Sequence, residues 1–233
     1  MCGGYTTPDG WQELRIEFAT TATQIERCYA VRPFDAAPIA LARADGPSLE
    51  RADQWSLIPP FAKERRLPYS TFNARLDKLT SSPVWRTSFP KKRCLVPADG
   101  FFERVPEKGA PKKRPYYVRF QDRRTFCFAG LWSEWTDAKT GEVLLTFTVV
   151  TTRNNALMEK IGHPRMPCIL APQHEAMWLD PSFDDKDALV KLVEPPVPGE
   201  MLEAEPVDHL VNFRKEHGPE IVEPIGPAVR VSA

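Results

Sequence analysis

Cys2 is the residue of this sequence whose position points most directly to chemistry. Removal of the initiator methionine is favoured before a small residue, so we expect the mature chain to begin with cysteine. An N-terminal cysteine carries an amine and a thiol on adjacent carbons, and its α-amine has a pKa of about 7.7–8.0. With an aldehyde, such an amine forms a Schiff base and the thiol closes on it to give a thiazolidine. An isolated cysteine at position 2 is usually inert, so this prediction depends on the residues that accompany it.

Three further groups of side chains could serve such chemistry. Asn73 offers both a donor and an acceptor, and Arg75 suits a phosphate. Glu103 lies in an apolar run, where burial would raise the pKa of its carboxyl enough for acid catalysis near neutral pH. His163 lies in a loop bounded by Gly and Pro, a common place for a functional imidazole. Each group also has an ordinary structural interpretation: a turn Asn, a surface Arg, an outward-facing Glu on a strand.

The segment 55–66 combines aromatic and basic residues. Trp55 and Phe61 flank two prolines and precede Lys63, Arg65 and Arg66. Aromatic rings beside basic residues can stack on unpaired bases, but the same pattern is typical of a buried strand that ends in a proline turn. The whole chain has 31 basic and 31 acidic residues, which argues against a protein coated in positive charge while leaving room for a local basic groove.

The elements that must position these residues are predicted to be short strands. The 233 residues include 24 prolines, roughly twice the usual ~5%, which excludes helical bundles and favours β-rich architecture. The predicted strands are 28–34, 38–43, 54–58, 93–96, 100–104, 116–120, 126–132 and 143–151. The predicted helices are 152–161, 172–179 and 184–193, with a helical turn at 82–89, a hairpin loop at 106–114, and a Pro/Glu-rich stretch at 194–206 that leads to a terminal strand. We expect one α+β domain over 1–233, built around an antiparallel, barrel-like sheet.

The number and spacing of the cysteines and histidines indicate the cellular compartment and which cofactors to expect. The five cysteines are odd in number and widely spaced, with no C-x-x-C pair, so we expect neither a disulfide framework nor a thiolate zinc site. The four histidines show no ligand spacing, and we expect no metal and no cofactor. The sequence has no apolar run of about 20 residues and no signal-peptide pattern, which predicts a cytoplasmic protein.

The order of the motifs along the chain is specific. The motifs are Met1-Cys2-Gly3, Trp55-x-Leu57-Ile58-Pro59, Asn73-Ala74-Arg75, the run from Cys94 to Glu103 (Cys-Leu-Val-Pro-Ala-Asp-Gly-Phe-Phe-Glu), Pro115-Tyr116-Tyr117, Phe128-Ala129-Gly130-Leu131-Trp132, Thr151-Thr152 and His163-x-Arg165-Met166-Pro167. In this order they resemble the SRAP (SOS-response-associated peptidase) family, whose members shield abasic sites in single-stranded DNA. The resemblance covers residues 2 to about 225, nearly the whole chain.

The resemblance implies a pseudo-barrel with short peripheral helices and a basic groove for single-stranded DNA. It implies a thiazolidine between Cys2 and the aldehyde of an abasic site, with Asn73 orienting Cys2 or the open sugar. Glu103 would be the acid and base for ring opening and Schiff-base formation, and His163 would assist proton transfer. Arg75 would hold a flanking phosphate. The other residues expected to contact DNA are Trp55, Phe61 and Arg165.

Alternatives from other classes stay open. The family name implies a peptidase, and a cysteine peptidase would use Cys2 as nucleophile, His163 as base and Asn73 as orienting group. A lyase-type activity on DNA and a noncovalent single-strand binder are further options. We expect a monomer whose partner is single-stranded DNA containing abasic sites, associated with the nucleoid when bound.

The chain departs from the family pattern at several positions. Gly4 stands where arginine is usual, Ser56 where glycine follows the tryptophan, and Phe61 where tryptophan is common. The first change removes one expected phosphate contact, and the others alter the stacking loop. Retention of Met1 would block thiazolidine closure, because the α-amine would then belong to methionine.

Overall fold

The computed structural model describes residues 2–10, 20–21, 25–107, 109, 111–212 and 218–232. Its strands are β1 (Tyr5–Thr6), β2 (Thr20–Thr21), β3 (Ala37–Arg43), β4 (Gly46–Ala52), β5 (Gln54–Trp55), β6 (Asn73–Arg75), β7 (Arg93–Ala98), β8 (Gly100–Val105), β9 (Arg114–Phe120), β10 (Phe126–Thr136), β11 (Val143–Arg153), β12 (Arg165–Pro167) and β13 (Leu202–Pro206). Its α-helices are α1 (Ala156–Lys160), α2 (Glu175–Leu179) and α3 (Lys186–Val193), with short 3-10 turns between elements.

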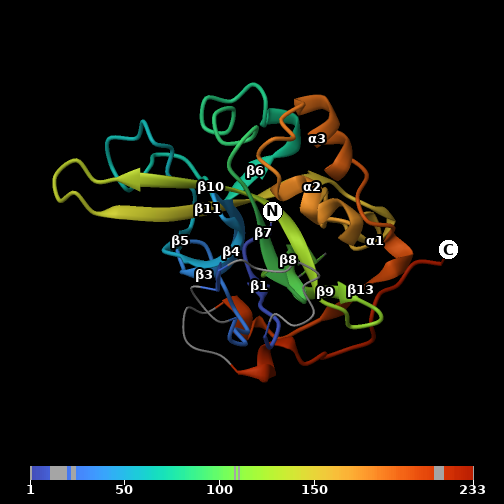
Figure 1. Ribbon diagram of the computed structural model, residues 1–233. Coiled ribbons are helices and arrows are strands. Elements are labelled where there is room, and N and C mark those ends of the chain that lie inside the picture. The colour runs from blue at the N-terminus through green and yellow to red at the C-terminus, as the bar shows by residue number, and fades with distance from the viewer. Residues whose placement is uncertain are drawn as a thin grey trace.

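The described strands form two sheets that share a corner. One sheet has the order β1-β8-β9-β13, and the other runs β12-β11-β10-β7-β3-β4-β2, with β5 and β6 pairing parallel to β11. The chain passes from β7 in the larger sheet to β8 in the smaller one through Asp99 alone, so the sheets curl into a half-barrel (Figure 1). The short helices lie outside it. The predicted fold class, an α+β antiparallel β-rich pseudo-barrel with peripheral helices, is confirmed.

Aromatic side chains from both sheets fill the space between them. Tyr5 of β1 and Phe101 of β8 meet Phe128 of β10 edge-on, with ring centroids 5.8 Å and 6.0 Å apart. Trp55 of β5 meets Tyr5 in the same way at 5.2 Å. All four rings are fully buried, so these contacts lock the two sheets at a fixed angle.

Most predicted strands are present, with two exceptions. The predictions at 38–43, 93–96, 100–104, 116–120, 126–132 and 143–151 correspond to β3, β7, β8, β9, β10 and β11. The strand predicted at 28–34 is wrong: only an isolated bridge between Tyr5 and Val31 forms, and Phe34 has a φ of 76°, which ends any extended run. The strand predicted at 54–58 is limited to Gln54–Trp55.

The helical predictions are correct in place but too long at their starts. The helix predicted at 152–161 begins only at Ala156, because β11 continues to Arg153 and Asn155 caps the helix through the Met158 amide. Segment 172–179 forms a 3-10 turn followed by α2, and 184–193 forms α3 after the Asp185 cap. Segment 82–89, predicted as a helical turn, forms consecutive turns in which the Arg86 amide donates to the Ser82 carbonyl at 3.0 Å.

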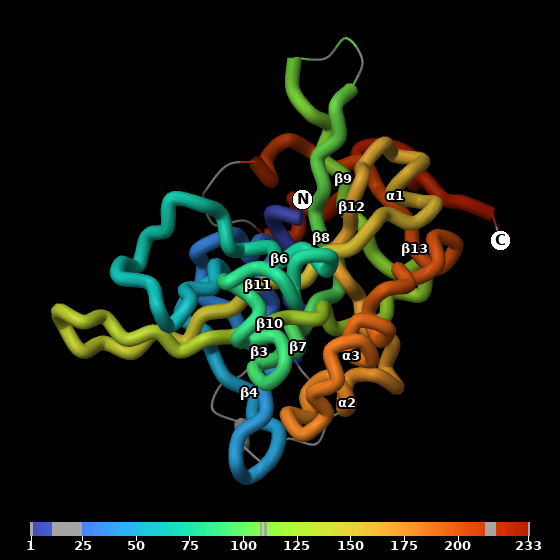
Figure 2. Tube along the Cα trace, turned by 90° about the horizontal axis from the view of Figure 1, so that it is seen from above, coloured from blue at the N-terminus to red at the C-terminus, as the bar shows by residue number. Residues whose placement is uncertain are grey.

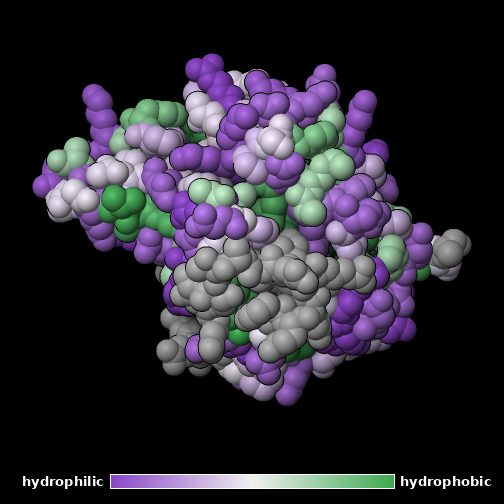
Figure 3. Space-filling view, in the orientation of Figure 1, coloured by the Kyte–Doolittle hydropathy of each residue, from purple (hydrophilic) through white to green (hydrophobic). Residues whose placement is uncertain are grey.

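The distal parts of β10 and β11 project from the body as an arm, which consists of residues 132–146. Pairing between β10 and β7 ends at Leu131, whereas pairing between β10 and β11 continues to Thr136 and Val143. Figures 1 and 2 show this yellow arm beside the cyan segment that follows β5. On the face drawn in Figure 3, hydrophobic side chains form small patches separated by hydrophilic ones.

Candidate active site

The pairing of β1 with β8 brings Cys2 alongside β8 at the edge of the smaller sheet. Tyr5 is opposite Phe101, and the Phe102 amide donates to the Gly4 carbonyl at 2.9 Å. Continued by one residue, this register places position 3 opposite Glu103. Cys2 is 1% exposed, and its thiol donates to the Gly4 carbonyl at 3.4 Å.

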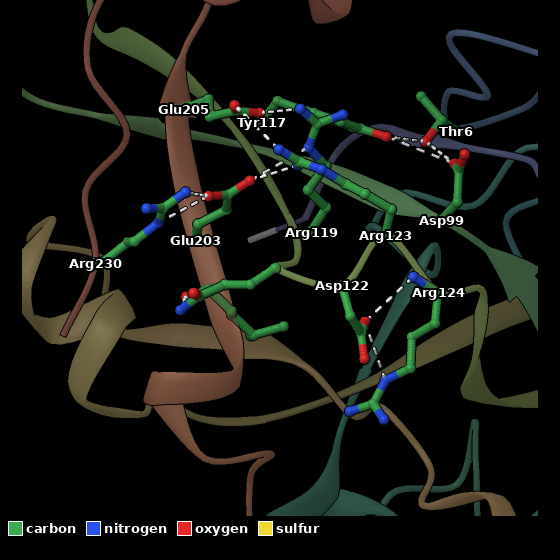
Figure 4. A network of polar contacts seen from close by, with 12 residues as sticks. Thr6, Asp99, Tyr117, Arg119, Asp122, Arg123, Arg124, Glu203, Glu205 and Arg230 are labelled. Atoms are coloured by element: carbon green, nitrogen blue, oxygen red, sulfur yellow. Dashed lines mark hydrogen bonds and ion pairs between the residues drawn. The ribbon is translucent and has the colours of Figure 1, made fainter. Parts of the chain in front are cut away.

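A polar tie fixes the other end of β1. Thr6 donates its hydroxyl hydrogen bond to Asp99 at the corner between the sheets, and its Oγ1 lies 2.7 Å from the Tyr117 hydroxyl (Figure 4). Arg27 forms an ion pair with the same Asp99 carboxylate. β1, which follows Cys2 in the chain, is therefore held in a fixed register against β8.

Asn73 holds the main chain of Cys2. β6 pairs with β11 so that Asn73 is opposite Val149, and the Asn73 Nδ2 donates to the Cys2 carbonyl at 2.7 Å. The side chain is nearly buried, and its Oδ1 atom has no hydrogen-bond partner among the described residues. An unmet buried acceptor costs about 1–3 kcal/mol, so the site has a place for a donor from a ligand or from an amine.

Glu103 and His163 form a buried pair. The Glu103 Oε2 lies 3.1 Å from the His163 Nε2, and both side chains are less than a tenth exposed. The His163 Nδ1 lies 2.6 Å from the Arg165 carbonyl, and because a carbonyl only accepts, this nitrogen carries a hydrogen. A neutral His163 then has its lone pair on Nε2, so the short contact with Glu103 requires one further proton between the two groups.

Burial sets the proton affinity of this pair. Burial raises the pKa of Glu103 to about 7, against the opposing effect of nearby positive charge that includes Arg104. Burial also lowers the pKa of His163 from its ordinary value, in spite of its bond to the Arg165 carbonyl. A carboxyl and an imidazole shifted in these directions can share and move one proton near neutral pH.

Two arginines lie on strands attached to β11. Arg75 of β6 is half exposed, and its guanidinium pairs with Asp77 at 2.7 Å. Arg165, the first residue of β12, donates to the carbonyl and hydroxyl oxygens of Thr151 at 2.7 Å and 3.0 Å. Thr151 is opposite Arg75 on one side and Pro167 on the other. The two guanidinium groups thus lie at the same end of β11.

Trp55 and Phe61 have opposite environments. The prediction that Trp55 contacts DNA is wrong for this structure, because the ring is fully buried and its Nε1 donates to the Phe72 carbonyl at 2.6 Å. Trp55 therefore supports the residue next to Asn73. Phe61, by contrast, is 57% exposed.

The sequence did not point to two exposed aromatic residues beside this region. Phe34 and Tyr69, with Arg65 and Arg66, line a groove of about 310 Å³. Tyr69 could have been found as a further aromatic residue after the basic cluster. Phe34 carried no such signal: it is exposed and has a positive φ, and the sequence around it indicated neither.

Three further features of the described residues concern metal binding, a second cavity and membrane-spanning helices. No group of three or more His, Cys, Asp or Glu side chains in the described part of the chain is arranged to hold a metal ion. A cavity of about 680 Å³, with Phe126, Ile169 and Val197 in its wall, contains none of the predicted site residues. None of the described helices is long and apolar enough to cross a membrane.

Comparison with known proteins shows which family the chain belongs to. The family model "SOS response associated peptidase (SRAP)" matches residues 1–214. The chain belongs to the SRAP family. Among SRAP relatives, the abasic site processing protein YoqW of Bacillus subtilis is 40% identical over 171 residues, covering 73% of this chain and 74% of its own. The abasic site processing protein HMCES of Xenopus tropicalis is 33% identical, covering 88% of this chain and 70% of its own.

Solved structures support the same fold. A protein from Bacteroides thetaiotaomicron superimposes with a TM-score of 0.74 at 30% identity, over 86% of each chain. The SRAP fold of this chain thus has a measured counterpart.

Proposed function

We propose that this protein processes abasic sites in single-stranded DNA by forming a covalent crosslink through Cys2. The observation that carries the proposal is that Asn73 holds the Cys2 main chain beside a buried Glu103–His163 pair that shares a proton. Its relatives YoqW and HMCES are named abasic site processing proteins, which supports abasic sites as the substrate.

The first chemical step is opening of the abasic sugar. This sugar is mostly a closed hemiacetal, and opening it requires a proton on the ring oxygen and loss of the proton from the C1 hydroxyl. The Glu103–His163 pair can supply the first proton and take up the second, because burial raises the pKa of Glu103 to about 7 and the His163 imidazole lies beside this carboxyl. The product is a free aldehyde, with no net change in protons or electrons.

The second step joins the aldehyde to Cys2 after Met1 has been removed. The free α-amine adds to the aldehyde carbon, and the carbinolamine loses its hydroxyl as water with a proton from the Glu103–His163 pair. The thiol then adds to the imine carbon and its proton ends on nitrogen, so that aldehyde and aminothiol give thiazolidine and one water. The unmet Oδ1 acceptor of Asn73 is suited to hold the amine or a sugar hydroxyl.

The peptidase alternative has less support from the geometry. Burial raises the pKa of the Cys2 thiol far above its ordinary value, whereas a peptidase nucleophile needs a thiolate. The thiol contacts the Gly4 carbonyl, and the imidazole of His163 faces Glu103. In thiazolidine closure, by contrast, the thiol proton passes to the imine nitrogen, so the step needs no separate base for the thiol.

The proposal also includes a surface that binds the single-stranded DNA on either side of the abasic site. Arg75 and Arg165 would contact phosphates, and Phe61 would stack on an unpaired base. A noncovalent single-strand binder would use the same surface but would leave no adduct.

One experiment separates these functions. The protein, with Met1 removal checked by intact mass, is incubated with an abasic oligonucleotide, an intact oligonucleotide and a generic peptide, and the products are run on denaturing gels. We expect a denaturant-stable adduct with the abasic strand alone. Peptide cleavage without an adduct would favour the peptidase. If neither an adduct nor a cleaved peptide forms, only the noncovalent binder remains.

A further inference from the structure

Segment 56–72 exposes aromatic rings without regular structure of its own. It connects β5 to β6, and Phe61 and Tyr69 are 57% and 48% exposed. At its base the segment closes on itself, through a 2.8 Å contact between the Ser56 and Thr71 hydroxyls and a bond from the Leu57 amide to the Thr71 carbonyl. The base does not explain what keeps Phe61 directed into solvent instead of folding onto the surface.

The arm formed by residues 132–146 holds the part of the segment that carries Phe61. The Trp135 Nε1 donates to the Ala62 carbonyl at 2.7 Å, and the Ile58 amide donates to the Thr146 Oγ1 at 3.0 Å. Trp135 packs with Ile58 and Leu144 in a small buried cluster that is separate from the main core. Because residues 58 and 62 flank Phe61 closely on both sides, the arm fixes its backbone.

We propose that the arm is a positioning element for strand binding and that Trp135 is its key residue. Trp135 is 2% exposed, so it acts on a bound strand only through the segment that presents Phe61. The identity of the ligand, single-stranded DNA, rests on the proposed function. The attachment of segment 56–72 to the arm does not, because it is given by the contacts described above.

The first test needs no DNA. Lys63, Arg65 and Arg66 lie just after the anchored residues and are cleavage sites for trypsin. Trp135→Phe keeps an apolar ring and removes the donor to Ala62, so cleavage at these sites should become about 2- to 10-fold faster, the equivalent of one hydrogen bond. Trp132→Phe is the matched control on the same arm, because the Trp132 ring faces Arg43 and Lys92 at about 5 Å rather than the segment. It should be cut at the wild-type rate.

The second test measures crosslinking against concentration of an abasic oligonucleotide. Trp135→Phe should raise the half-saturating concentration by about 2- to 10-fold and leave the maximal rate unchanged, because the site at Cys2 is untouched. In the background of Phe61→Ala, Trp135→Phe should have no further effect, since a positioning residue acts only through the residue it positions.

The outcomes are distinct for the two proposals. Wild-type trypsin cleavage in Trp135→Phe, or effects of Trp135→Phe and Phe61→Ala that simply add, would overturn the role of the arm. If Trp135→Phe does not fold, Thr146→Val removes the acceptor of the Ile58 amide at constant shape and should give the same faster cleavage. Absence of any adduct or binding in the wild type would refute the proposed function, while trypsin would still decide whether the arm holds the segment.

Discussion

At the scale of single residues, the chemistry of the candidate site depends on the protonation states of Cys2, Glu103 and His163. Cys2 has a buried, neutral thiol, and the carbon next to it carries the α-amine of the same residue once Met1 is removed. Glu103 and His163 are nearly fully buried, so they offer almost no exposed charge for binding DNA. Their contribution in the proposal is therefore to rate, and that of Cys2 is to bond formation.

Substitution of Cys2 separates the two bonds of the adduct. Cys2→Ala should abolish the denaturant-stable adduct while leaving the fold and a weak strand affinity, because its amine alone gives only a hydrolysable imine. Cys2→Ser should form a Schiff base that borohydride traps, whereas the untreated adduct falls apart. Cys28→Ser, at an exposed cysteine, is the matched control and should crosslink normally. Equal crosslinking by Cys2→Ala on denaturing gels would instead indicate a lysine.

Substitution of Glu103 tests the shared proton. Glu103→Gln keeps the shape and a donor toward His163 but removes titration, so single-turnover crosslinking should slow by about 10²- to 10⁴-fold at neutral pH. Strand affinity should change little. The measurement is the rate of crosslinking between pH 5 and 8, with Glu107→Gln on the exposed end of the same hairpin as control. Superimposable profiles for Glu103→Gln and wild type would remove Glu103 from the mechanism and leave His163.

At the scale of elements, β11 organises the site because so many strands pair with it. It places β6 and β12 on its two sides, and hence Asn73, Arg75 and Arg165 at one end of the sheet. The ion pair of Arg75 with Asp77 is exposed and contributes little to stability, so the guanidinium is free to exchange its partner for a phosphate.

Arg75 and Asp77 should have opposite effects on binding of the strand. If each phosphate contact contributes about −0.7 to the log–log salt slope for single strands, Arg75→Ala should make the slope shallower by about 0.7 and weaken binding. Asp77→Asn removes the competing carboxylate and should strengthen binding at low salt. Fluorescence anisotropy with an intact oligonucleotide at several salt concentrations measures both. An unchanged slope in Arg75→Ala would mean that Arg75 does not contact a phosphate.

The elements that could be predicted are those long enough to show a pattern. β10 and β11 have long apolar and β-branched runs, while β6 and β12 have three residues each and are defined only by their partner β11. In the same way, the types of Cys2 and Glu103 indicated their chemistry, but the contact of Glu103 with His163, 60 positions later, depends on tertiary structure. Trp55 shows the limit of local pattern: its burial comes from Tyr5 and Phe147, which are distant in sequence.

At the scale of the whole molecule, the described residues include several buried charged groups, among them Arg93, Glu103, Glu175 and Glu203. Besides the Glu103–His163 pair, Glu203 of β13 is fully buried and forms ion pairs with Arg119, Arg123 and Arg230 (Figure 4). Arg230 lies in the C-terminal segment beyond the family match, which also bridges to β13 through Ala204 and Val229. Each carboxylate oxygen of Glu203 has an arginine partner, whereas burial raises the pKa of Glu103 in the candidate site to about 7.

The free-energy cost of ionising the buried Glu103 carboxyl should make the stability of the protein depend on pH. The pKa of Glu103 is about 7 in the folded protein and near 4.5 when unfolded, so the folded state binds the proton more tightly. The stability that the neutral carboxyl contributes is therefore fully present below pH 4.5 and is lost as the pH rises through 7. At 1.36 kcal/mol per pKa unit, the loss relative to Glu103→Gln is about 3 kcal/mol.

Urea unfolding of wild type and Glu103→Gln at pH 5 and pH 8 measures this difference. The variant should gain on wild type as the pH rises, because Gln has no charge to desolvate, while groups common to both proteins cancel. Glu50→Gln is the control: Arg43 holds the pKa of Glu50 below its ordinary value of 4.5, so Glu50 is ionised throughout this range and the difference between wild type and Glu50→Gln should stay nearly constant from pH 5 to pH 8. If wild type and Glu103→Gln kept a constant difference from pH 5 to pH 8, Glu103 would be ionised throughout and could not be the acid that opens the sugar.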